Sequence, residues 1–119
     1  MLKKTIFVLY LLLITALSLW PSDGLPDIAL FAGADKIIHA GMYAGLTFIL
    51  FWAWPERFSN KKQILPLLAI FLWGFLMELL QKFTFLGRNF DMTDELANTL
   101  GFIPGWLCWI WVKRINTPK

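Results

Sequence analysis

The amino-acid sequence predicts an all-α protein, a four-transmembrane-helix bundle with both termini in the cytoplasm. Of its 119 residues, 58% are hydrophobic and only 16% are charged, and the mean hydropathy is +0.61. Such a composition is typical of membrane proteins. The apolar residues fall in four runs, each close to the ~20 residues that span a hydrocarbon core. We expect helices over residues 5–20, 37–54, 64–81 and 95–112, in a single transmembrane domain covering residues 1–119.

The distribution of basic residues predicts the orientation, because Lys and Arg are retained on the cytoplasmic side of the membrane. Eight of them flank the cytoplasmic ends of the runs: Lys3, Lys4, Arg57, Lys61, Lys62, Lys113, Arg114 and Lys119. The alternate loops, at residues 21–36 and 81–95, are mainly acidic, and we expect them outside. The net charge of +3 therefore describes an orientation signal. Outside the helix ends the sequence has no stripe of basic residues that would indicate a nucleic-acid partner.

The first helix, over residues 5–20, has a second interpretation. Lys3 and Lys4 followed by an apolar run and Ala16-Leu17-Ser18 resemble a secretory signal with a cleavage site. We favour a retained helix, because the run is long for a signal core. Its loss would also leave only three helices to enclose the polar groups described below.

The second helix, over residues 37–54, begins with polar residues that share one face. Asp35 and His39 are four residues apart, and Lys36 lies at the same helix start. Gly41 and Gly45 form a pair of small residues that lets helices approach closely. Gly41 is two positions from His39, or about 200° around the helix, so the pair is expected to face the first helix.

The third helix, over residues 64–81, contains a carboxylate where the sequence is otherwise apolar. Glu78 is preceded by a run from Leu65 to Met77 and followed three residues later by Gln81, with Gly74 one turn earlier on the same face. A charge deep in a bilayer costs several kcal/mol, so such a residue is a candidate functional residue.

The fourth helix, over residues 95–112, is entered by Asp91, Asp94 and Asn98, which share a face with Gly101 and Gly105. That face is expected to be the close-packed one, and Asp91 also suits a helix cap. All three polar helix ends point outward under the predicted topology. We expect them to meet at one depth and to bring together Asp35, His39, Glu78, Gln81, Asp94 and Asn98, with Lys36 and Arg88 from the adjoining loops.

Three motifs resemble the VanZ-like family of small bacterial membrane proteins, named for a member linked to resistance to the glycopeptide antibiotic teicoplanin. The motifs are Asp35-Lys-Ile-Ile-His39 with Tyr43, Glu78-Leu-Leu-Gln81, and the segment from Arg88 to Gly101. The resemblance covers most of the chain. It implies a multi-pass, four-helix protein of the bacterial cytoplasmic membrane, with these polar residues as the family's signature and a link to antibiotic resistance, but it supplies no settled biochemical activity.

The polar residues predict a pocket that opens outside the cell and acts on a cell-envelope lipid or a lipid-linked anionic substrate. His39 is the candidate general acid or base, with Asp35 orienting its imidazole and Glu78 or Asp94 as a second acid/base group. Lys36 and Arg88 suit an anionic headgroup. The other candidates for substrate binding are Gln81, Asp91 and Asn98.

The sequence leaves catalysis undecided and identifies no cofactor. Asp35, His39, Glu78 and Asp94 could offer mixed ligands to a divalent metal, although one histidine is few, and we assign no metal. A second class of function is a non-catalytic membrane protein that binds an envelope lipid or an antibiotic. A third is a structural or interaction subunit, in which buried polar groups hold the helices in register. The expected partners are membrane lipids and a second copy of this small bundle.

Overall fold

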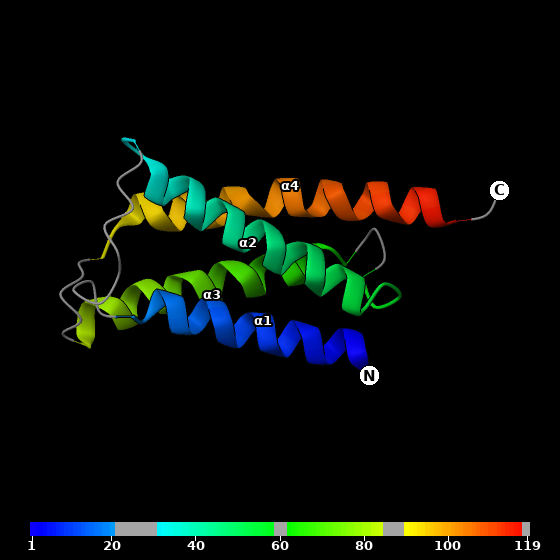
Figure 1. The fold of residues 1–119 in the computed structure, drawn as a ribbon, viewed down its shortest axis with the longest axis horizontal. Coiled ribbons are helices and arrows are strands. Elements are labelled where there is room, and N and C mark those ends of the chain that lie inside the picture. The colour runs from blue at the N-terminus through cyan, green and yellow to red at the C-terminus, as the bar shows by residue number, and fades with distance from the viewer. Residues whose placement is uncertain (21–30, 59–61, 85–89, 118–119) are drawn as a thin grey trace.

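The computed structural model describes residues 1–20, 31–58, 62–84 and 90–117. The regular secondary structure of these residues is all helical: α1 is Leu2–Ser18, α2 is Ala34–Ala53, α3 is Ile64–Phe83 and α4 is Met92–Asn116. Successive helices run in opposite directions along the bundle (Figure 1). The prediction of an all-α fold with four helices is confirmed.

The largest difference from the predicted helix bounds is in α4, which extends beyond residues 95–112 at both ends. Asp91 caps its start, since its Oδ1 accepts hydrogen bonds from the backbone N–H of Thr93 at 2.8 Å and from the Thr93 hydroxyl at 2.6 Å. Lys113 and Arg114 lie in the last turn, where cations are favoured by the helix dipole. Apolar periodicity does not detect these hydrophilic turns, which explains the difference.

Two of the described helices, α2 and α3, are long and apolar enough to cross a membrane. Each has 20 residues, which corresponds to a length of about 30 Å, the thickness of a hydrocarbon core. α1 is shorter, with 17 residues. α4 carries ionisable side chains in its first and last turns.

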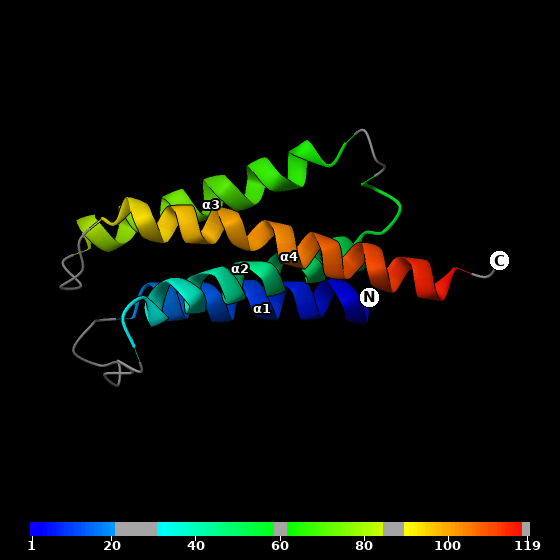
Figure 2. The same ribbon diagram turned by 90° about the horizontal axis from the view of Figure 1, so that it is seen from above.

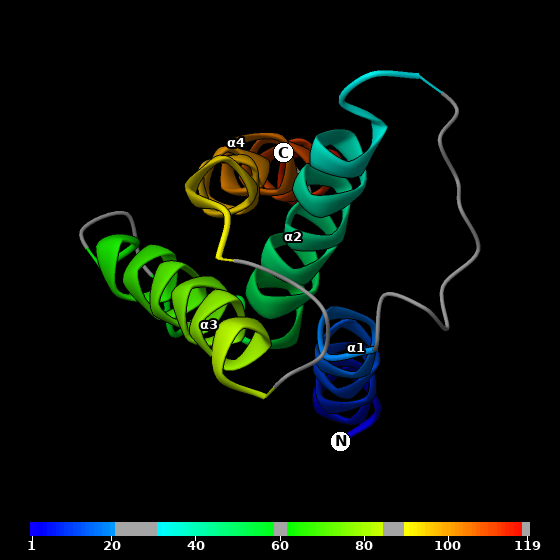
Figure 3. The ribbon, with the colours of Figure 1, turned by 90° about the vertical axis from the view of Figure 1, so that its left-hand side faces the viewer.

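Helix α2 lies between α1 and α4, and its contact with α4 is the most extensive in the bundle (Figure 3). Glycines make this approach possible: a Cβ atom on Gly101 would meet the carbonyl oxygen of Ala40, and one on Gly105 would meet that of Ala44. The predicted small-residue face of the last helix is therefore the close-packed one.

Helix α1 packs on α2 where Gly45 leaves room for a tyrosine. A Cβ atom on Gly45 would meet the Tyr10 hydroxyl, which donates a hydrogen bond to the carbonyl oxygen of Met42 at 3.0 Å. Gly45 thus faces the first helix as predicted. Gly41 has no heavy atom within 4 Å of its Cβ position, so it does not contribute to this contact.

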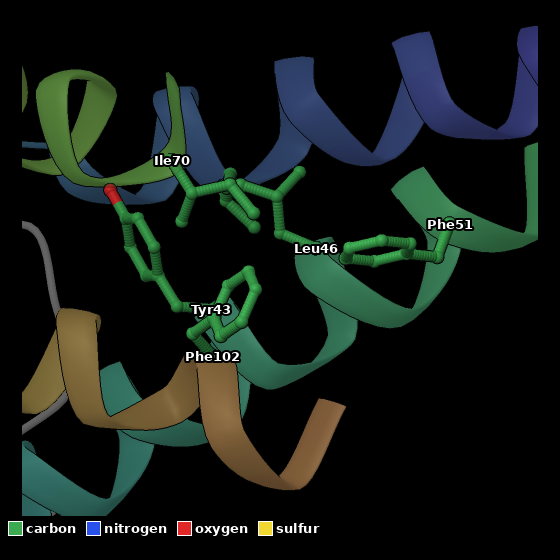
Figure 4. Packing of buried hydrophobic residues seen from close by; sticks show 6 residues of the cluster. Tyr43, Leu46, Phe51, Ile70 and Phe102 are labelled. Carbon is green, nitrogen blue, oxygen red and sulfur yellow. The ribbon is translucent and has the colours of Figure 1, made fainter. Parts of the chain in front are cut away.

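The apolar core receives side chains from all four helices. Figure 4 shows Tyr43, Leu46 and Phe51 of α2 packed with Ile70 of α3 and Phe102 of α4. Ile14 of α1 completes the cluster, and the rings of Phe51 and Phe102 meet edge to face at 6.1 Å. By packing the four helices together, this core holds their ends close to one another at both ends of the bundle.

The two ends of the bundle differ in charge. The starts of α2 and α4 and the C-terminal ends of α1 and α3 lie at one end, which we call the polar end. The start of α1 and the end of α4 lie toward the other, the basic end (Figure 1). Lys3 and Lys4 lie at the basic end with their ammonium groups over the rings of Trp52 and Trp54, at 5.0 and 5.8 Å. The remaining described cations there are Arg57, Lys62, Lys113 and Arg114.

A mostly apolar groove lies between α2 and α3 at the basic end. At this end α3 also diverges from α4 (Figure 2). Leu50 of α2 and Trp54, which follows that helix, line one side; Leu65 and Ala69 of α3 line the other, and Arg57 lies beside them. This groove is separate from the polar side chains, which meet at the opposite end of the bundle.

Candidate functional site

Lys36 lies at the centre of a group of charged side chains at the polar end. Its ammonium is 2.9 Å from Asp35 Oδ2 and 2.8 Å from Asp91 Oδ2, and it also contacts Asp94 Oδ1. Asp35 belongs to the same helix, whereas Asp91 and Asp94 lie at the start of α4. Lys36 therefore joins α2 to α4 through charge-assisted hydrogen bonds.

His39 lies one turn deeper in α2 and is 9% exposed. Its Nδ1 is 2.9 Å from Asn98 Oδ1, which is a normal hydrogen-bond distance. Its Nε2 is 3.8 Å from Asp94 Oδ2, close enough for an ion pair but too far for a hydrogen bond. The imidazole is thus held at one nitrogen and faces a carboxylate with the other.

Asp35 was the expected partner of the His39 imidazole, but among the described contacts its carboxylate pairs with Lys36, and its side chain is 61% exposed. Asn98 takes the place beside the ring. A spacing of four residues puts Asp35 and His39 on one side of α2, and packing against α4 then supplies a closer partner for the histidine.

Glu95 is a buried carboxyl that the sequence reasoning did not include among the candidates. It is 2% exposed, and its Oε2 accepts a hydrogen bond from Asn98 Nδ2 at 3.3 Å. Its Oε1 is buried without a hydrogen-bond partner in the described part of the chain. The signal was its position three residues before Asn98, since residues three apart share a helix face.

A glycine on α3 makes the space that Glu95 occupies. A Cβ atom at Gly74 would lie 2.6 Å from Glu95 Oε2, closer than side chains approach. The sequence placed Gly74 on the face of Glu78 and Gln81, and that face does turn toward α4. The glycine therefore admits a carboxyl group between α3 and α4.

Glu78 and Gln81, both on α3, are each 1% exposed but contact different neighbours. Glu78 Oε2 lies 3.4 Å from the backbone nitrogen of Asp91, which places it beside the start of α4. Gln81 Nε2 donates a hydrogen bond at 2.7 Å to the carbonyl oxygen of Ser18 at the end of α1. Glu78 thus adjoins the charged group around Lys36, whereas the Gln81 amide links α3 to α1.

We call Asp35, Lys36, His39, Asp91, Asp94, Glu95 and Asn98 the polar cluster, with Glu78 at its edge. Arg88, the second predicted cation, lies outside the described residues. Across the described ranges, no three His, Cys, Asp or Glu side chains are grouped so that they could hold a metal ion. Of the four side chains considered as metal ligands, Asp35 and Asp94 instead contact the ammonium of Lys36.

The Lys36 ammonium lowers the pKa of the Asp91 carboxyl, and hydrogen bonds from Thr93 lower it further. Asp91 precedes α4, and its side chain is 43% exposed. It therefore stays ionised at acidic pH while it both caps α4 and pairs with α2.

A family model described as VanZ/LLP1 matches residues 7–113, a range that includes the polar cluster and nearly the whole chain. No curated protein and no solved structure matches the chain.

Proposed function

The chain belongs to the VanZ/LLP1 family, and from this premise we propose that it is a multi-pass protein of the bacterial cytoplasmic membrane that acts on a cell-envelope lipid. In this proposal all four helices cross the membrane. The polar end faces outward, and both termini lie in the cytoplasm. The separation of charge supports this orientation, because the cations at the basic end then lie on the side where Lys and Arg are retained.

The observation that carries the proposed chemistry is the setting of His39. One ring nitrogen is engaged by Asn98 at 2.9 Å, while the other faces Asp94 at 3.8 Å. In the proposed reaction, Nε2 takes a proton from a hydroxyl group or water at the substrate headgroup and later returns it. Asp94 stabilises the positive imidazolium formed between these steps. Glu78, buried at the edge of the cluster, serves as the second acid/base group.

The proposed substrate class is a lipid with an anionic headgroup. Lys36 is the described cation that would bind it, but three carboxylates already surround its ammonium. A headgroup oxygen must therefore replace one of them. Asp35 has the most exposed carboxylate of the three and is the one proposed to move aside. Arg88 is proposed as a second contact to the headgroup.

Product formation tests this function directly. Purified protein in nanodiscs is incubated with an envelope lipid extract, and the lipids are analysed by mass spectrometry before and after. We expect altered lipids with the wild type, and none with His39→Ala or Glu78→Gln at near-normal abundance and thermal stability. Saturable lipid binding with unchanged lipids would overturn catalysis in favour of a binding protein.

Teicoplanin susceptibility of cells with and without the protein tests the proposed link to antibiotic resistance.

A structural role is the second candidate, and the contacts of Lys36 favour it. One ammonium joins α2 to Asp91 and Asp94 of α4, as expected of a group that holds helices in register. If this is the main role, His39→Ala and Glu78→Gln should unfold the bundle or prevent its insertion. Normal stability of both variants with loss of product would contradict it.

A further inference from the structure

Glu95, Asn98 and His39 form a hydrogen-bonded chain from a buried carboxyl to the imidazole. Asn98 Nδ2 donates to Glu95 Oε2 at 3.3 Å, and Asn98 Oδ1 lies 2.9 Å from His39 Nδ1. All three residues are at most 9% exposed, so water does not compete freely for these bonds. The chain runs across the interface between α2 and α4, since His39 lies on α2 and the other two residues lie on α4.

The direction of each bond follows from what the groups can donate. A carboxyl oxygen without a proton only accepts, so the side of the Asn98 amide that faces Glu95 Oε2 is its NH₂ group. The opposite side, facing the imidazole, is then the amide oxygen, which also only accepts. While Glu95 is ionised, His39 Nδ1 must therefore donate and must carry a proton. In the neutral imidazole this leaves Nε2 without a proton, facing Asp94.

We propose that Glu95 is a positioning residue: by orienting the Asn98 amide, it fixes the proton of His39 on Nδ1 and leaves Nε2 as the proton acceptor. Without Glu95 the Asn98 side-chain amide can flip by 180° without a steric penalty, because its oxygen and nitrogen are nearly the same size. Its NH₂ group would then donate to Nδ1, and the proton would move to Nε2. His39 Nε2 could then no longer accept a proton from the substrate, although every residue of the proposed reaction would still be present.

The statement about the proton stands without the proposed function, and only its catalytic consequence rests on that proposal. The chain contains a single histidine, so ¹⁵N-histidine labelling of the full-length, untagged protein reports on His39 alone. The spectrum is recorded in nanodiscs at about pH 9, above the ordinary titration range of imidazole. We expect the wild type to carry its proton on Nδ1. A proton on Nε2 would overturn the inference by itself.

Two substitutions at Glu95 test its role. Glu95→Met keeps an unbranched side chain of similar length beside Gly74 but accepts no hydrogen bond from Asn98. We expect the proton to shift from Nδ1 to Nε2, seen as an exchange of the two ¹⁵N signals. Glu95→Leu should give the same shift and is the second variant if Glu95→Met does not fold. A folded variant of either kind that keeps the proton on Nδ1 would overturn the proposal.

A rescue and a control separate this role from general packing. In Glu95→Met/Asn98→Asp, a carboxylate replaces the amide and can only accept, so the proton should return to Nδ1. The control is Thr99→Val, which removes the hydroxyl that donates to the backbone oxygen of Glu95 at 2.9 Å and should leave the proton on Nδ1. If the proton moved to Nε2 in Thr99→Val, or did not return to Nδ1 in the double variant, the effect would be due to packing.

The spectra also separate this inference from the proposed function. If Glu95 controls the proton but no altered lipid is ever formed, catalysis fails and the inference stands. If altered lipid is formed by the wild type and by Glu95→Met alike, with the proton moved to Nε2, the catalytic role of Glu95 is overturned while the proposed function survives.

Discussion

Gly101 of α4 lies directly against the backbone carbonyl of Ala40 in α2. The neighbour is main chain, which cannot move aside as the end of a flexible side chain can. One turn further along α4, Gly105 meets the carbonyl of Ala44 in the same way. The distance between α2 and α4, and with it the alignment of His39 with Asn98, depends on the absence of two side chains.

Gly101→Ala is therefore expected to destabilise the bundle. The added methyl group must push α4 away from α2, at a cost of about 1–3 kcal/mol. Unfolding by denaturing detergent measures the change. Gly41→Ala is the matched control, because nothing lies within 4 Å of its Cβ position. It should be neutral or stabilising by up to about 1 kcal/mol, since alanine favours helix. Equal effects of the two substitutions would contradict the close contact at Gly101.

Lys36→Met is expected to destabilise the protein at neutral pH, because Asp35, Asp91 and Asp94 would lose the cation that neutralises them. Removing one partner of a fully buried pair costs roughly 3–5 kcal/mol. About a third of the Lys36 side chain is exposed, so water screens the charges and we expect about 1–2 kcal/mol. Lys36→Arg should recover much of the loss, and Lys82→Gln, which removes a cation in the last turn of α3 outside the cluster, should have little effect. Wild-type stability of Lys36→Met would contradict the role of the ion pairs.

The lowered pKa of Asp91 predicts how its contribution depends on pH. Its carboxylate is favoured in the folded state, so the stabilisation is complete above its unfolded pKa of about 3.9 and is lost as the pH falls through the lower folded pKa. Asp91→Asn keeps a good helix cap but removes the charge. The difference in thermal midpoint between wild type and Asp91→Asn should be constant above about pH 5 and should shrink below about pH 4. A difference that grows on acidification would have the wrong sign.

The proposed topology predicts which ends of the helices are accessible from outside the cell. Cys108 is exposed and is replaced first by serine, giving a background without cysteine. In that background, Phe31→Cys at the polar end should react with a membrane-impermeant thiol reagent in intact cells. Glu56→Cys and Arg114→Cys, at the basic end, should react only after the membrane is permeabilised. Labelling of all three positions from the same side would contradict the four-span arrangement.

The sequence predicted the helices and their faces better than the partners across them. Periodicity placed Gly101 and Gly105 on the close-packed face of the last helix, and the structure puts both against α2. Asp35, four residues before His39, was predicted to orient its imidazole. Spacing within one helix fixes which residues share a side, but it does not say which residues of another helix come closer. In the structure the Asp35 carboxylate pairs with Lys36, and the His39 imidazole contacts Asn98.

Glu95 was missed because it was counted only among the acidic residues of an outer loop. Its burial depends on Gly74 of α3, a glycine 21 positions earlier in the chain, and no pattern within α4 reveals that contact. Gln81 was expected near the other polar residues, and its amide instead reaches Ser18 of α1. Both outcomes depend on how far neighbouring helices are rotated about their axes, which sequence spacing does not determine.

The most extensive helix contact in the described part of the chain joins α2 to α4. During synthesis α2 leaves the ribosome well before α4, and α3 emerges between them. Lys36 and His39 of α2 therefore have no α4 partners until α3 and the start of α4 have also been synthesised. A chain that stops before residue 91 would retain Lys36 and His39 without any of their α4 partners, so the polar cluster cannot form until the start of α4 has been made.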